Sequence, residues 1–103
     1  MKVTRIESIV LLNRYHLVRV YTDEGIDGVG EVSPMNAAVT HAMVERALAP
    51  LVVGEDPFDV ERIWHKMLHR PYKLGPTGAQ LEAMAGIDIA LWDVIGKAAG
   101  QPL

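Results

Sequence analysis

Apolar and β-branched residues dominate the first 32 positions of the chain, in short runs separated by turn-forming residues. Two runs, Val3 to Leu12 and Leu17 to Thr22, have the composition of β-strands. The residues between them, Asn13 to His16, are few enough for a hairpin loop. A second turn, with Gly25 supplying positive φ, precedes a third run from Ile26 to Val32. The pattern predicts a three-stranded antiparallel meander.

After this region, apolar residues recur at every third or fourth position, which is the spacing of one helix face. A first helix is predicted from about Asn36 to Val53. Gly54 ends it, and Pro50 is expected to bend or loosen its last turn by removing a donor. A second helix is expected to start near Asp56, whose carboxylate can accept from open backbone amides, with Pro57 at the first helical position.

A third helix is predicted from about Thr77 to Ala99, and its pattern differs from that of the other two. Apolar residues leave it no continuous polar face, and Gly86 with its neighbouring alanines permits close backbone approach. A helix that is apolar on nearly all sides belongs inside a larger structure. We therefore expect one side of this helix to need a further partner, and the chain to be a fragment or part of an assembly.

These elements predict an α+β fold, a three-stranded antiparallel meander followed by three helices. The chain has 103 residues, which allows one domain, covering residues 1–103. Half of the residues are hydrophobic and 22% are charged, as in ordinary globular proteins. The chain is therefore expected to fold around a single small core.

Charge and cysteine content narrow the function classes. Ten Lys and Arg against thirteen Asp and Glu give a net charge of -3 without a run of like charges, which disfavours nucleic acid and anionic membranes as partners. No apolar run approaches the roughly 18 residues of a membrane span, and the amino terminus lacks the apolar stretch of a signal peptide. The absence of cysteine fits a reducing compartment, so the prediction is a cytoplasmic protein.

Isolated signals for metal or phosphate binding are weak. His65 and His69 lie four residues apart, but Lys66 stands where a zinc-protease motif needs glutamate, so a solvated polar edge is the better interpretation. The glycines between Gly25 and Gly30 lack the dinucleotide fingerprint and indicate a bulge or close packing.

Two carboxylates, Asp88 and Asp93, interrupt the third helix on different faces. Since buried charges are paired, each is expected to bond a helix terminus or a basic side chain such as Arg5 or Lys97. No nucleophile arrangement is recognisable among the remaining candidates, Ser8, Ser33 and the four histidines.

Two segments together, Thr22 to Glu31 and Ala85 to Leu103, resemble the amino-terminal region of the mandelate racemase and muconate lactonizing enzyme group of the enolase superfamily. The turn from Gly54 to Pro57 fits as well, so the resemblance covers essentially the whole chain. The short hairpin at Asn13 to Tyr15 and the connection from Tyr72 to Pro76 look most like those of acid-sugar dehydratases of the galactonate and mannonate type.

The resemblance implies a capping domain set against a C-terminal (β/α) barrel that this chain is too short to include. In the family the barrel supplies the catalytic bases and the carboxylates that hold Mg²⁺, which stabilises the enediolate formed by α-proton abstraction. The implied activity is dehydration of a sugar acid by the parent protein, commonly a homo-oligomer, with no catalytic or metal-binding residue in this chain.

Two alternatives remain open. A racemase or cycloisomerase of the same group would carry the same kind of domain. A standalone interaction module would use the apolar third helix to bind a partner or another copy of itself, because large exposed apolar patches usually mark interfaces.

The resemblance also implies that two loops, Asn13 to His16 and Ser33 to Asn36, close over the barrel mouth and select the substrate. Arg14 is expected to pair with a substrate carboxylate, and Tyr15 and Asn36 to bond sugar hydroxyls. Met35 and Asn36 depart from the dehydratase patterns, which leaves the particular acid open.

Overall fold

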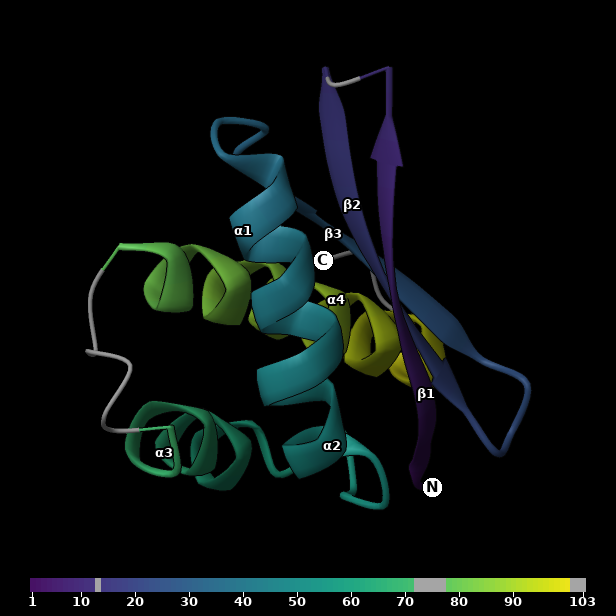
Figure 1. The fold of residues 1–103 in the computed structure, drawn as a ribbon. Helices are drawn as coiled ribbons and strands as arrows, with labels where there is room; N and C mark the ends of the chain where they lie inside the picture. The colour runs from purple at the N-terminus through teal and green to yellow at the C-terminus, as the bar shows by residue number, and fades with distance from the viewer. Residues whose placement is uncertain (13, 72–77, 101–103) are drawn as a thin grey trace.

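The computed structural model describes residues 1–12, 14–71 and 78–100, and it contains the predicted meander. Strands β1 (Val3–Leu11), β2 (Tyr15–Thr22) and β3 (Asp27–Val32) form one antiparallel sheet in that order (Figure 1). The helices follow the sheet in the sequence: α1 (Ala37–Ala42), the π-helix η1 (Met43–Leu48), α2 (Ala49–Val52), α3 (Val60–His69) and α4 (Ala79–Ala99). The α+β class predicted from the sequence is confirmed.

The hairpin between β1 and β2 is tighter than the sequence predicts. Tyr15 and His16 already pair with Leu11 and Val10, so the prediction that the loop extends to His16 is wrong. The chain reverses early because Leu12 adopts a left-handed conformation with φ of 53°. His16 then falls on the same side of β2 as the buried Val18 and Val20, as the two-residue period of a strand requires.

The helix predicted from Asn36 to Val53 forms, but its middle turn is π-helical. The Ala49 amide donates to the Val44 carbonyl, an i to i−5 bond, immediately before Pro50, which has no amide to donate. The irregular turn therefore lies before Pro50 and not in the last turn, where the sequence predicts it. Gly54 ends the helix with φ of 94°, as predicted.

The second helix begins later than expected. The Asp56 carboxylate accepts from the Phe58 amide at 3.0 Å and so closes a turn that precedes the helix. Asp59 is not helical, with φ of −84° and ψ of 54°, and α3 starts at Val60. The predicted start near Asp56 is wrong because Asp56 and Pro57 serve this turn.

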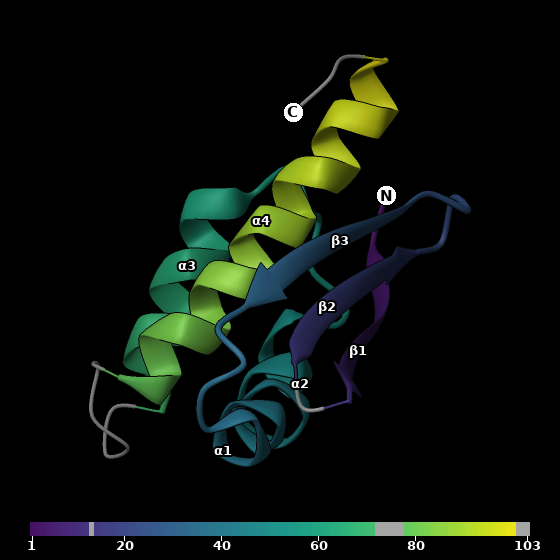
Figure 2. The same ribbon diagram turned by 90° about the horizontal axis from the view of Figure 1, so that it is seen from above.

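One face of the sheet carries the core. Helix α4 crosses this face, and the run from α1 to α2 packs beside it, with α3 alongside α4 (Figures 1 and 2). The fully buried large side chains come from both layers and include Val18, Val20, Leu48, Ile63, Met67, Met84, Ile87 and Leu91.

The contact between β3 and α4 is a glycine seam, formed by Gly28 and Gly30 on the strand and Gly86 on the helix. A Cβ atom on Gly30 would lie 2.1 Å from the Gly86 carbonyl oxygen, and one on Gly28 would lie 2.2 Å from that of Ala90. A Cβ atom on Gly86 would in turn lie 2.3 Å from Val32. The strand and helix backbones therefore touch, which confirms the close-packing interpretation of these glycines.

A further side of α4 is left uncovered. Ile89 and Trp92 are 42% and 46% exposed, and Ala85 is exposed on the same side. Within the described part of the chain, no helix is long and apolar enough to cross a membrane. The sheet and α3 thus bury only part of this mostly apolar helix, in agreement with the expectation from its sequence.

The glycine seam predicts that Gly30→Ala destabilises the fold by about 3 kcal/mol, near the top of the range for overpacked cores, because the strand must move off α4. Urea unfolding measures the change. Gly25→Asn is the matched control, since Gly25 faces open space and Asn tolerates its positive φ. Equal stability of the Gly30→Ala variant and the original chain would contradict the seam.

Candidate functional site

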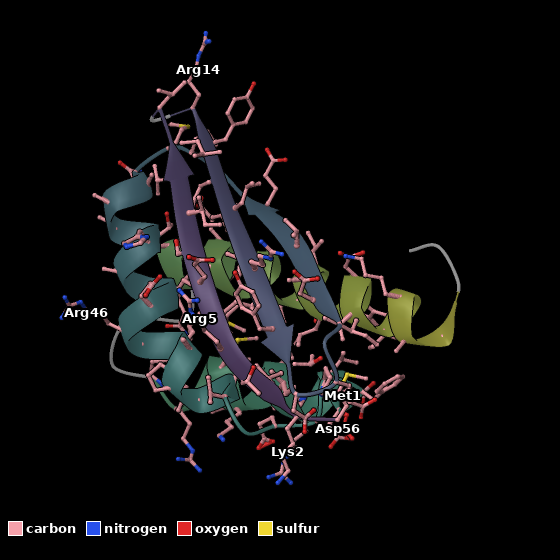
Figure 3. The ribbon with its side chains drawn as sticks, turned by 90° about the vertical axis from the view of Figure 1, so that its right-hand side faces the viewer. Met1, Lys2, Arg5, Arg14, Arg46 and Asp56 are labelled. Atoms are coloured by element: carbon pink, nitrogen blue, oxygen red, sulfur yellow. The ribbon has the colours of Figure 1, made fainter. Side chains whose placement is uncertain are left out.

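The two loops implicated by the sequence lie at one end of the molecule. The hairpin tip between β1 and β2 and the segment leading into α1 are both at the top of Figure 1. Arg14 projects from the tip, at the end of the sheet opposite Met1 and Asp56 (Figure 3). The fold therefore brings Arg14, Tyr15 and Asn36 to a common end, although they come from separate segments.

These three side chains are open to solvent. Tyr15 is 54% exposed, and Arg14 and Asn36 are exposed. Within the residues that the structure describes, no side-chain hydrogen bond ties any of the three to the domain. Asn36 is left-handed (φ 58°, ψ 37°), and its carbonyl accepts from the Val39 and Thr40 amides to begin α1. The loop backbone is thus anchored while the polar groups remain available; Asn13 lies outside the described residues.

A buried polar network lies beneath this end, and the sequence reasoning missed it. Ser8 Oγ lies 2.5 Å from His16 Nε2 and 2.8 Å from His41 Nδ1. His16 Nδ1 lies 3.1 Å from Thr40 Oγ1, and the Ser8 amide donates to Glu45 Oε1 at 2.9 Å. The sequence predicted no nucleophile arrangement among these residues, and it gave no sign that β1, β2, α1 and η1 bring serine and histidine together from distant positions.

Donors and acceptors can be assigned to every hydrogen bond between the side chains of the network without conflict. The Thr40 hydroxyl lies within reach of the Asn36 carbonyl at 3.4 Å and donates along the first turn of α1. Thr40 Oγ1 then accepts from His16 Nδ1–H, which leaves Nε2 to accept from the Ser8 hydroxyl. Ser8 Oγ in turn accepts from His41 Nδ1–H. This assignment links the hairpin strands to the turn that carries Asn36.

Burial determines the chemistry of this network. His16 is fully buried, and burial, with a smaller contribution from His41, lowers the pKa of its imidazole. His16 is therefore neutral near pH 7. Ser8 is only 7% exposed, so a substrate does not reach its hydroxyl. We interpret the network as support for the two loops and not as a nucleophile site. One sequence signal could have revealed the network: His16 stands two residues before Val18 and four before Val20, on the buried side of β2.

The other residues considered in the sequence, two aspartates of α4 and two histidines of α3, have different surroundings. Asp93 pairs with Lys97 at 3.1 Å and accepts from the Val29 amide at 3.0 Å, as expected. Asp88 was also expected to bond a helix terminus or a basic side chain, but no described side chain or backbone amide donates a hydrogen bond to its carboxylate. The rings of His65 and His69 stack in parallel with their centroids 5.9 Å apart.

The described residues do not cluster into a metal site. They contain no group of three or more His, Asp or Glu side chains able to hold a metal ion. A metal-dependent reaction would therefore need ligands from outside this part of the chain.

Comparison with known proteins assigns the fold to a family. Residues 6–103 match the model of the mandelate racemase/muconate lactonizing enzyme N-terminal domain. The meander, the helices that cover one of its faces and the paired loops at one end define an enolase-superfamily N-terminal domain. The chain belongs to the mandelate racemase/muconate lactonizing enzyme family.

Similar sequences carry a common name. A D-galactonate dehydratase from Pectobacterium atrosepticum is 39% identical over 105 residues, and one from Xanthomonas campestris pv. campestris is 40% identical over 104. Each alignment covers 100% of this chain and 27% of the relative. The chain thus spans about a quarter of the length of these relatives.

Solved structures of the same family have the same fold as this chain. A mandelate racemase/muconate lactonizing protein from Paracoccus denitrificans superposes with a TM-score of 0.90 at 38% identity, covering 98% of this chain and 28% of that one. A protein of the same description and organism, complexed with magnesium, gives 0.86 at 35% identity, covering 95% and 28%. These likenesses confirm the fold class predicted from the sequence.

The network predicts that stability falls in mild acid. The lowered pKa of His16 means that the unfolded chain binds its proton first, near pH 6.5, so stability is full above that value and declines below it. The His16→Asn variant is expected to be less stable at neutral pH, because the network is broken. Its stability is expected to fall less between neutral and acidic pH, because the titrating imidazole is gone. Urea unfolding at pH 7.5 and pH 5.0 measures both effects, with exposed His65→Gln as control; an unchanged pH dependence in His16→Asn would contradict the assignment.

Proposed function

We propose that this chain is the capping domain of a Mg²⁺-dependent dehydratase that removes the proton α to the carboxylate of a sugar acid and then eliminates water. In this proposal the hairpin tip and the 33–36 loop close over the barrel active site, select the substrate and exclude water. Arg14 pairs with the substrate carboxylate, while Tyr15 and Asn36 bond its hydroxyls. D-galactonate is the first substrate to test, because the similar proteins named above are D-galactonate dehydratases.

The observation that carries the proposal is the common position of three exposed polar residues, Arg14, Tyr15 and Asn36, above a buried, hydrogen-bonded network. Sites held by packed elements position their ligand-binding groups more accurately than free loops do. An exposed guanidinium at a hairpin tip has the geometry to form two parallel hydrogen bonds with a carboxylate.

The catalytic groups and the ion belong, in this proposal, to a barrel domain in the rest of the parent protein. The described residues do not fit a magnesium site. The isolated 103 residues are therefore expected to be inactive. A cytoplasmic location, expected from the absence of cysteine, and a homo-oligomeric parent, implied by the family resemblance, remain predictions.

A racemase or cycloisomerase is the alternative within the family. Such an enzyme would also exchange the α proton but would not release water. Incubating the full-length protein with Mg²⁺ and a panel of sugar acids in D₂O separates the cases. A dehydrated 2-keto product supports the proposal, exchange with inversion or isomerisation supports the alternative, and no exchange with any acid of the panel contradicts the proposed dehydratase.

The role of Arg14 gives a specific prediction for the full-length protein. Arg14→Ala is expected to lower kcat/KM for the acid by about tenfold to a hundredfold, since a hydrogen bond to a charged group contributes about 1.5–3 kcal/mol. Arg14→Lys is expected to keep part of the activity because it retains the charge but not the paired donors. Steady-state kinetics measure both.

Arg46 provides the matched control. It is exposed on η1 and points away from the hairpin tip (Figure 3). Arg46→Ala is expected to leave kcat/KM unchanged. Equal effects of Arg14→Ala and Arg46→Ala would contradict a substrate contact at the tip.

A further inference from the structure

The side of α4 away from the sheet borders a groove that the domain itself does not fill. Figure 2 shows α3 running alongside α4, and between them lies an open groove of about 450 Å³. Its lining consists of Val60, Glu61, Trp64, His65, Asp88 and Trp92. Trp92 is 46% exposed, and the neighbouring Ile89 extends the apolar surface along α4.

The groove combines indoles with carboxylates, and its described lining residues include no lysine or arginine. Trp64 and Trp92 provide aromatic faces, while Glu61 and Asp88 provide negative charge. This pairing favours a cation, because a guanidinium or ammonium group is attracted both to a carboxylate and to an indole face.

Asp88 is the group whose surroundings most clearly call for a partner. It is partly buried, and no hydrogen bond or ion pair reaches it from the described residues. Burial accordingly raises the pKa of its carboxyl. Asp93, five residues further along α4, illustrates the usual solution, since Lys97 neutralises it. A carboxylate removed from water without such a partner carries a free-energy cost that a docked cation would offset.

We infer that the α3–α4 groove receives a basic side chain, with an arginine as the best fit, from the barrel domain of the parent protein. Its guanidinium pairs with Asp88 and lies against the indoles, and apolar residues beside it cover Ile89 and Trp92. Arginine fits better than lysine because it is weakly hydrated, planar and able to form paired bonds. The inference rests on the proposed function only in that the parent contains a barrel; the similar dehydratases are nearly four times as long as this chain.

Photo-crosslinking in the full-length protein identifies the occupant. p-Benzoylphenylalanine at position 92 is expected to link to a peptide of the same polypeptide outside residues 1–103. The same group at position 39, on the exposed surface of α1, is the control. A link from position 92 to a second copy, or no link at all, would overturn the inference.

A charge substitution tests the pairing independently. In the full-length protein, Asp88→Asn is expected to lower Tm by at least about 3 °C, because it leaves the docked cation without its counter-charge. Glu61→Gln, an exposed carboxylate of the same groove, is expected to leave Tm nearly unchanged. An unchanged or higher Tm in Asp88→Asn is the result for a lone buried carboxylate and would refute the pairing.

Neither experiment uses catalysis as its readout. A parent protein that fails to dehydrate any sugar acid would contradict the proposed function and leave these two results to decide the groove.

Discussion

The backbone contact between β3 and α4 is the constraint on which the rest of the domain depends. Glycines on both elements bring a strand and a helix closer than any side chain would allow. This contact fixes the height of α4 over the sheet, and α3 and the α1–α2 run pack around α4. The seam therefore links the sheet that carries the hairpin tip to the helices that pack on its face.

The sequence predicted the fold class, the strand order and the helix end at Gly54, because alternation, helical periodicity and positive-φ glycines are local signals. The sequence-based prediction was wrong where the same residues are compatible with two local structures. Asp56 and Pro57 suit a helix start, but they form the turn before α3. The π-helical turn before Pro50 was also invisible, since a single proline does not say which turn will absorb the missing amide.

The candidate site was predictable only in part. The family resemblance pointed to Arg14, Tyr15 and Asn36, and whether they contact a substrate remains a prediction. The support beneath them could not be predicted from spacing, because Ser8, His16 and Thr40 meet only through tertiary packing. That no described residue pairs with Asp88 was missed for the same reason: the rule that buried charges are paired holds for a finished structure, and this groove is open.

The separation between the buried network and the exposed tip has a consequence for how such domains diversify. The side chains of Arg14 and Tyr15 are exposed, so substitutions there are expected to change the stability of the fold little. The Ser8 and His16 pair beneath them keeps the loops in place whatever residues they display. Under the proposed function, a lineage would acquire a new substrate by changing the tip alone, with the supporting residues inherited intact.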